Sequence, residues 1–200
     1  MASTYALLDD VKDALRISDD HDDVVLAGVI ESASRAIDQY CDRYFGQSGT
    51  EASPVQRLYR ANGRVVLVDD LVTLTEVEVE YAGYAETFTS LGSTSVIKQP
   101  VNAATLVPAQ PYTQLLAKPS TVFPQPPGWV RISGVWGWPA VPQQIRDACV
   151  LQSVRLFKSR DIPLGYASGG DSMGTIVIPG PGLHPDAKAL AEPFRRMSVA

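Results

Sequence analysis

Apolar residues recur at helical spacing near both ends of the chain. The repeat at positions i, i+3, i+4 and i+7 predicts four helices, at about 8–16, 22–45, 142–160 and 185–197. The longest of them has one apolar stripe, made by Leu26, Val29/Ile30, Ala33, Ile37, Tyr40/Cys41 and Tyr44/Phe45. Its opposite face is polar and includes Ser34 and Asp38. Both ends of the chain are therefore predicted to fold as amphipathic helices.

Residues that start and stop helices support these limits. The segment Ser18–Asp23 offers several side-chain oxygens that can cap the second helix, and Gly46 follows its last apolar residue. Pro142 suits the first position of the third helix, whereas Pro193 should end or kink the fourth. The third helix has a wide apolar face over 143–157, which predicts that it is covered on more than one side.

The middle of the chain, at about 55–135, changes to a period of two, which is typical of β-strands. The predicted strands are Val65–Val68, Leu74–Val79, Ser95–Ile97, Tyr112–Leu116 and Trp129–Ile132. Asn62-Gly63 lies between 57–60 and 65–68, where it predicts a two-residue hairpin turn. Frequent prolines keep these strands short.

Together these patterns predict an α+β fold with a helical bundle core and an inserted antiparallel β-rich region at about 55–135. Residues 1–160 are expected to form a single domain. Residues 161–200 are expected to form a Gly/Pro-rich C-terminal arm that ends in a short anchor helix. Within this arm, Thr175–Ile178 is the one strand candidate.

The charge of the chain is unevenly placed. The first 23 residues hold seven Asp against Lys12 and Arg16, and so account for the whole formal net charge of −5. No basic patch stands out, so the charge pattern of a tight nucleic-acid binder is missing. No apolar run approaches the roughly 18 residues of a membrane span, and the N-terminus lacks the pattern of a secretory signal. The sequence therefore predicts a soluble protein without a membrane partner.

The candidates for metal binding each lack a necessary part. Cys41 and Cys149 have no further Cys or His nearby, so they are expected to be buried, reduced thiols rather than metal ligands. The stretch 20–31 resembles a calcium loop only in its first aspartates, because Val25 stands where the sharp turn needs glycine. We therefore predict no metal site.

The candidates for catalysis are equally incomplete. His21 and His184 lie in polar turns, and the glycines of 165–174 are not followed by the Lys of a phosphate-binding loop. Asp69 and Asp70 follow a predicted strand and are expected to form a turn rather than a catalytic pair. The sequence therefore predicts no catalytic and no cofactor-binding residues.

Several segments are more informative together than any single motif. The chain begins with LLDDVKDALRI at 7–17 and continues, after a short acidic break, with DDVVLAGVIESASRAIDQYCDRYF at 22–45. It later contains GVWGWPAVPQQIRDACVLQSVRLFKSRDIPLG at 134–165 and closes with HPDAKALAEPFRRM at 184–197. In this order and spacing, the segments resemble the first two helices, the last long core helix and the closing segment of bacteriophage head-to-tail adaptor (connector) proteins. The resemblance is to those of long-tailed actinobacteriophages.

The resemblance implies a structural virion protein that is not an enzyme and needs no cofactor. It implies a homo-oligomeric ring of about twelve copies that docks beneath the portal protein in the virion neck, after assembly in the host cytoplasm. Such a ring extends the channel through which double-stranded DNA passes without sequence-specific binding, and it gives a platform for the stopper and tail-completion proteins. Two alternatives stay open: another neck component, such as a stopper or tail-completion protein, and a small hydrolase.

Two groups of residues are candidate functional positions under this resemblance. The closing pattern is expected to dock on the portal through Leu190, Pro193, Phe194, Arg195 and Arg196. The acidic loop is a candidate channel lining that repels DNA phosphates through Asp19, Asp20, Asp22 and Asp23. The alternative for this loop is helix capping within a solvated turn.

Overall fold

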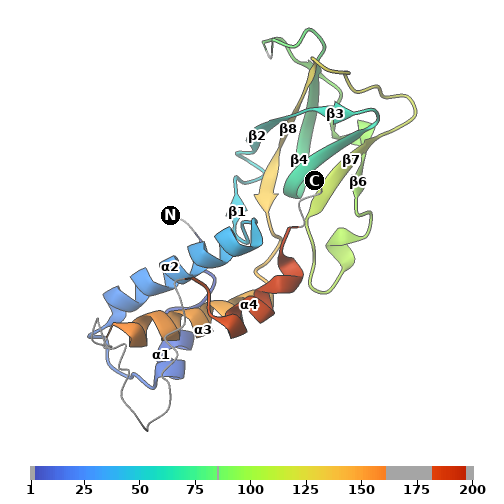
Figure 1. Ribbon diagram of the computed structural model, residues 1–200. Coiled ribbons are helices and arrows are strands. Elements are labelled where there is room, and N and C mark those ends of the chain that lie inside the picture. The colour runs from blue at the N-terminus through green and yellow to red at the C-terminus, as the bar shows by residue number, and fades with distance from the viewer. Residues whose placement is uncertain (1–2, 85, 161–181, 197–200) are drawn as a thin grey trace, which may run out of the picture. The chain divides into compact units, whose positions relative to one another are not determined.

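The structure is a computed structural model that describes residues 3–84, 86–160 and 182–196 (Figure 1). The chain divides into two compact units. One is formed by residues 1–43 together with 142–200, and the other by residues 44–141. The first is helical and the second is a β-sheet, so the predicted α+β class is confirmed. The predicted strand at Thr175–Ile178 lies outside the described residues.

The helical unit contains α1 (Leu8–Leu15), α2 (Asp23–Cys41), α3 (Gln143–Ser159) and α4 (Pro185–Ala191), which continues as the 3-10 turn η3 (Glu192–Phe194). α3 contacts each of the other three helices, and α2 also contacts α1 and α4. Most of the predicted stripe of α2 is buried, since Leu26, Ile30, Ala33, Ile37 and Cys41 are at most 3% exposed, whereas Val29 and Tyr40 are partly exposed. Helical periodicity therefore located the buried face of this unit.

The limits of two helices differ from the prediction. α2 ends at Cys41, because Asp42 takes the left-handed conformation at φ 51°, which a short polar side chain tolerates. Gly46 therefore doesn't end the helix as predicted. Instead its carbonyl accepts a hydrogen bond from the Trp138 N–H in the sheet unit. Pro193 does end α4 as predicted, because the α-helix stops at Ala191 and becomes a 3-10 turn.

Capping also differs from the prediction. Asp22 occupies the N-cap position of α2, but its side chain makes no capping hydrogen bond. Its carboxylate is turned to Arg160 instead, at 3.4 Å. Pro142 is the N-cap of α3 rather than its first helical residue.

The sheet unit is an antiparallel sheet of eight strands. These are β1 (Gln47–Ser48), β2 (Val55–Tyr59), β3 (Ala61–Asn62), β4 (Val65–Glu80), β5 (Thr89–Ser90), β6 (Val96–Gln99), β7 (Tyr112–Ala117) and β8 (Trp129–Gly137). The main order is β1-β8-β4-β7-β6, with β2 paired to β8, and with β3 and β5 paired to β4. Short 3-10 turns, η1 (Ser93–Ser95) and η2 (Ala103–Thr105), precede and follow β6.

β4 joins two strands that the sequence predicted separately. Asp69 and Asp70 lie inside this strand, so the predicted turn at these residues is wrong. The strand tolerates both carboxylates because each has polar partners. Asp69 accepts hydrogen bonds from Arg57 at 2.7 Å and from the Tyr59 hydroxyl at 2.9 Å. Asp70 is 5% exposed and accepts a hydrogen bond from the Trp138 indole N–H at 3.3 Å.

The predicted hairpin is present but shorter and shifted by one residue. Asn62 pairs with Val65, so the two-residue turn is Gly63-Arg64, with Gly63 at φ 63°. The strand before it, β2, pairs with β8 rather than with β4. The core of the unit lies on one face of the sheet and contains Val66, Leu115, Ile132 and Trp136 among its buried residues.

Candidate docking surfaces

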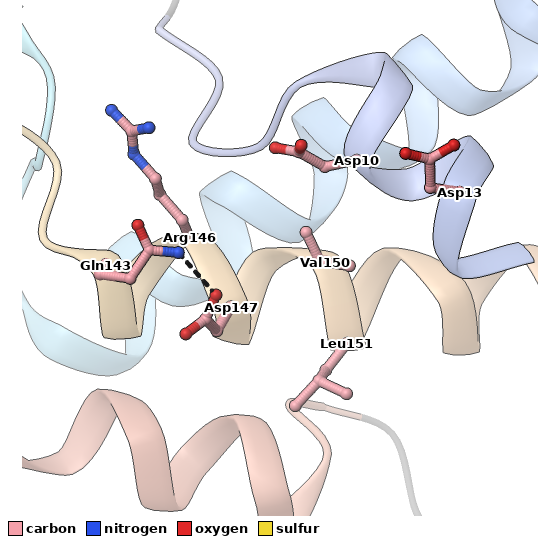
Figure 2. Close-up of a pocket in the computed structure, with 7 residues that line it drawn as sticks. All are labelled: Asp10, Asp13, Gln143, Arg146, Asp147, Val150 and Leu151. Atoms are coloured by element: carbon pink, nitrogen blue, oxygen red, sulfur yellow. Dashed lines mark hydrogen bonds between the residues drawn. The ribbon is translucent and has the colours of Figure 1, made fainter.

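A groove between α1 and α3 is one concave surface of the helical unit (Figure 2). It has a volume of about 500 Å³. We call it the α1–α3 groove, and its lining residues are Asp10, Asp13, Gln143, Arg146, Asp147, Val150 and Leu151. Along α3, the Gln143 amide donates a hydrogen bond to the Asp147 carboxylate at 2.9 Å.

The groove has an acidic and partly apolar lining. Three of its seven lining residues are aspartates, and Arg146 is the one cation among them. Leu151 belongs to the wide apolar face predicted for α3, and it is 44% exposed, whereas Ile145 and Phe157 of the same helix are buried. The contacts of α3 with three helices therefore leave part of its apolar face uncovered.

Sequence reasoning missed this groove because its two walls are far apart in the chain. Asp10 and Asp13 come from α1, and Asp147 comes from α3. The only sequence signal was the excess width of the apolar face of α3, which included Leu151. That signal predicts a second cover but not the acidic residues opposite.

The predicted acidic loop has two kinds of aspartate. Asp22 and Asp23 form ion pairs within the helical unit, to Arg160 at 3.4 Å and to Lys12 at 2.7 Å. The hydrogen bond that Lys12 donates to the Asp23 carboxylate raises the pKa of Lys12 above its ordinary value. Asp19 and Asp20 are exposed, and the Asp19 carboxylate accepts a hydrogen bond from the His21 N–H at 3.1 Å.

The closing segment, residues 182–196, lies against the end of α2. The Arg196 N–H donates a hydrogen bond to the Cys41 carbonyl at 2.8 Å. The Tyr40 hydroxyl bonds to the Glu192 carboxylate, which raises the pKa of Tyr40. Lys188 and Arg195 both lie over the Tyr40 ring, at 5.9 and 5.7 Å from its centre.

These contacts divide the five predicted portal-docking residues. Leu190, Phe194 and Arg196 are only partly exposed. Pro193 and Arg195 are exposed, although Arg195 also pairs with Glu192 at 3.9 Å. The surface of this segment that is open to a partner is therefore centred on Pro193 and Arg195.

The interior of the helical unit contains a polar contact that the sequence did not predict. Ser34 was placed on the polar face of α2, but it is fully buried, so this placement is wrong. The chain before α1 covers it, since the Tyr5 N–H donates to the Ser34 hydroxyl at 3.1 Å. Ser34 also contacts the Cys149 sulfur at 3.4 Å.

The two cysteines are buried and unpaired with each other, as predicted. Burial raises the pKa of the Cys41 thiol to about 12, and it also raises the pKa of the Cys149 thiol. In the described part of the chain, no group of three or more His, Cys, Asp or Glu side chains could hold a metal ion. His184 caps α4 by accepting a hydrogen bond from the Asp186 N–H at 3.3 Å.

The first half of the helical unit also matches a known family. Residues 5–67 match the family model described as phage gp6-like head-tail connector protein. The matched residues contain α1 and α2 and extend into β4 of the sheet unit. The resemblance to head-tail connector proteins is thereby confirmed. None of the helices described here is both long and apolar enough to cross a membrane.

Three solved chains share the fold over nearly the whole length. One is from the neck of an empty gene transfer agent (GTA) particle computed with C6 symmetry, with 18% identity, a TM-score of 0.59, and coverage of 98% of this chain and 92% of that one. Another is from the virion of a native GTA particle, with 17% identity, a TM-score of 0.54, and coverage of 100% and 94%.

The third is from the neck of a native GTA particle computed with C12 symmetry, with 17% identity, a TM-score of 0.52, and coverage of 100% and 97%. At these identities the likeness is one of fold. No curated protein matches the chain. The fold shared with these chains includes both the helical and the sheet unit, since almost every residue of this chain is covered.

Proposed function

We propose that this chain is a structural subunit of a virion neck, where it forms the adaptor ring between the portal and the tail. The observation that carries the proposal is the match of residues 5–67 to the head-tail connector family. The fold shared with chains of GTA necks and virions supports the same role. In this role the protein is structural and does no catalysis.

The proposed ring has about twelve copies. The similar neck chains come from particles computed with C6 and C12 symmetry, which agrees with a ring of about twelve copies. A head-to-tail ring needs two different faces on each subunit that fit one another. The acidic α1–α3 groove has the concave shape and the uncovered Leu151 that one of these faces requires.

The closing segment is the proposed contact with the portal. Leu190, Phe194 and Arg196 attach it to the helical unit, and Pro193 and Arg195 face outward. The exposed pair Asp19 and Asp20 is the proposed part of the channel lining, because Asp22 and Asp23 are already paired with cations. In this role the ring carries the DNA channel and supports the stopper and tail-completion proteins.

Portal binding tests the proposal directly. The full-length chain is mixed with purified portal rings from the phage that encodes it, and the complexes are imaged by negative-stain electron microscopy. We expect a second ring of fixed rotational order on one end of the portal. Absence of binding at micromolar concentrations would contradict the proposed function.

A pair of variants then tests the docking segment. The double substitution Pro193→Asp and Arg195→Asp changes exposed residues and should abolish portal binding. Because Arg195 also pairs with Glu192 and lies over Tyr40, an unchanged thermal midpoint must first show that the variant keeps the fold. Lys158→Asp is the matched control, because Lys158 is an equally exposed cation at the other end of the unit, on α3. Deletion of 161–200 is a weaker test, since α4 buries Ala187 and Ala191 and its loss would disturb the helical unit.

A further inference from the structure

One face of the sheet unit carries an apolar row that its own core does not use. Antiparallel register places Val65 opposite Leu116, and Leu116 opposite Ile97. The neighbours of these residues along each strand, such as Val66, Leu115 and Val96, point to the core. Because side chains alternate along a strand, Val65, Leu116 and Ile97 lie together on the opposite face.

Leu67 extends this row, since it is two residues beyond Val65 on β4. We call the four residues the outer apolar row: Val65, Leu67, Ile97 and Leu116. Leu67 is 64% exposed and Ile97 is 37% exposed, while the other two are partly exposed. A contiguous apolar group on a sheet surface marks an interaction site more often than scattered single residues do.

The row has a cation at one end and an ion-paired carboxylate at the other, since Asp69, two residues beyond Leu67 on β4, shares this face and bonds to Arg57 at 2.7 Å. Lys118 follows β7, and its N–H donates to the Ser95 carbonyl at 3.0 Å, so it continues the alternation and shares the face of Leu116. Gln99 and Gln114 are paired with each other and flank the row on the other side. The segments 65–67, 96–99 and 114–118 contain no acidic residue.

The α1–α3 groove has the complementary character. Its apolar lining residues are Val150 and Leu151, and its acidic lining residues are Asp10, Asp13 and Asp147 (Figure 2). An apolar surface with a cation at one end fits such a lining because opposite charges orient two partners, while apolar burial supplies the affinity. The start of α2 is a poor occupant, since its exposed Val24 directly follows Asp22 and Asp23.

We propose that the outer apolar row of one copy packs into the α1–α3 groove of a second copy, with Lys118 beside Asp10 and Asp13. This inference rests on the proposed ring, because a head-to-tail ring requires two unlike faces on each subunit. The row supplies one face from the sheet unit, and the groove supplies the other from the helical unit. Each subunit then donates its row to one neighbour and receives a row from the other.

Disulfide trapping between two variants tests this contact. Leu67→Cys and Leu151→Cys are prepared as separate full-length chains and mixed under mild oxidation, with and without portal rings. Both positions are exposed, and the native Cys41 and Cys149 are buried. We expect a heterodimeric disulfide in a yield at least about tenfold above a control, because a disulfide requires close Cα atoms.

The control is Val107→Cys mixed with Leu151→Cys. Val107 is 98% exposed on the loop after β6, so it reports random collisions between a very accessible thiol and the groove. Equal yields in the test and the control, with and without portal, would overturn the contact.

A chain that carries both Leu67→Cys and Leu151→Cys is oxidised at high dilution. An intramolecular disulfide there would also overturn the contact, because the row would then occupy the groove of its own chain.

Charge exchange gives an independent readout. Lys118→Glu and Asp13→Lys should each lower the trapped yield about threefold, and the two variants mixed as partners should restore it. Failure of the pair to restore the yield would remove Lys118 from the contact.

If portal binding persists without any trapping, the proposed function stands and this inference fails. If trapping occurs but no ring binds the portal, the contact between copies stands and the proposed function fails.

Discussion

The Tyr40 hydroxyl at the end of α2 bonds to the Glu192 carboxylate at the start of η3, which ties the closing segment to a helix more than a hundred residues earlier. Lys188 and Arg195 lie over the same ring. Glu192, Lys188 and Arg195 of the closing segment therefore all contact Tyr40. Its loss should loosen this segment without unfolding the unit.

Tyr40→Phe should therefore make the amides of 185–196 exchange with deuterium severalfold faster, because the mutant keeps the ring but loses the hydroxyl bond to Glu192. Amide exchange within the sheet unit should not change. Tyr84→Phe serves as the control, since Tyr84 is 78% exposed in a loop of the sheet unit. An unchanged exchange rate at 185–196 would show that the other contacts hold the segment without Tyr40.

The junction between β1 and β8 requires a glycine. Gly137 has φ +115°, and a Cβ atom there would lie 1.8 Å from the Gly46 carbonyl oxygen. Gly137→Ala should lower the free energy of unfolding by more than about 2 kcal/mol, because both the backbone conformation and the contact would have to change. Urea unfolding followed by circular dichroism measures this loss.

Gly28→Ala is the matched substitution for this experiment. Gly28 lies on the exposed side of α2, and a Cβ atom there meets nothing within 4 Å. Alanine should therefore raise the free energy of unfolding by up to about 1 kcal/mol, since it has the higher helix propensity. A similar loss of stability in both variants would refute the steric argument at Gly137.

The sequence predicted the local features of this fold well. Apolar periodicity located α2 and its buried residues, because a helical face depends only on residues a few positions apart. The strand pairings were not predictable in the same way. β2 pairs with β8, which lies some seventy residues away, although a turn signal next to it indicated a hairpin with β4. The local sequence indicated the turn, whereas packing in the folded unit determines that β2 pairs with β8.

The errors at polar residues have the same origin. Asp69 and Asp70 read as turn formers because their partners are absent from the local sequence. In the fold, Arg57 and Trp138 satisfy these carboxylates, so the strand continues through them. Similarly, Ser34 is buried because the chain before α1 covers it. The α1–α3 groove could not be predicted either, since it exists only where two distant helices pack.

The buried thiols should be inert in the native protein. Burial raises the pKa of Cys41 from 9.0 to about 12, so its reactive thiolate is scarce at pH 8. A colourless aromatic disulfide reagent at pH 8 should label neither Cys41 nor Cys149 until urea unfolds the chain, when both should react. Rapid labelling of the folded protein would contradict the observed burial.

The same shift has a consequence for stability at high pH. The folded state keeps the Cys41 proton up to about pH 12, whereas the unfolded chain releases it near pH 9.0. The folded state therefore binds more protons between these values, so this contribution to stability is lost as the pH rises from about 9 to 12. Cys41→Ala should show a less steep loss of the unfolding free energy over this range. Equal slopes would assign the loss to other groups.

The acidic loop can be tested by separating its two kinds of aspartate. Asp19→Asn with Asp20→Asn removes charge from exposed residues, so it should leave thermal stability unchanged. Asp22→Asn with Asp23→Asn removes the same charge but also breaks the ion pairs to Arg160 and Lys12, so it should lower the thermal midpoint slightly. The second pair is therefore the control for effects on folding.

Genome ejection from particles that carry these variants then separates channel lining from a local role. If Asp19 and Asp20 face the DNA, neutral side chains remove a repulsion that keeps phosphates from the wall, and ejection should slow in particles with the first pair. The slowing should decrease at high salt, because ions screen exposed charges. Normal ejection kinetics for Asp19→Asn with Asp20→Asn at low salt would exclude a role in the channel lining. The loop would then have only a local structural role, in its turn and its ion pairs.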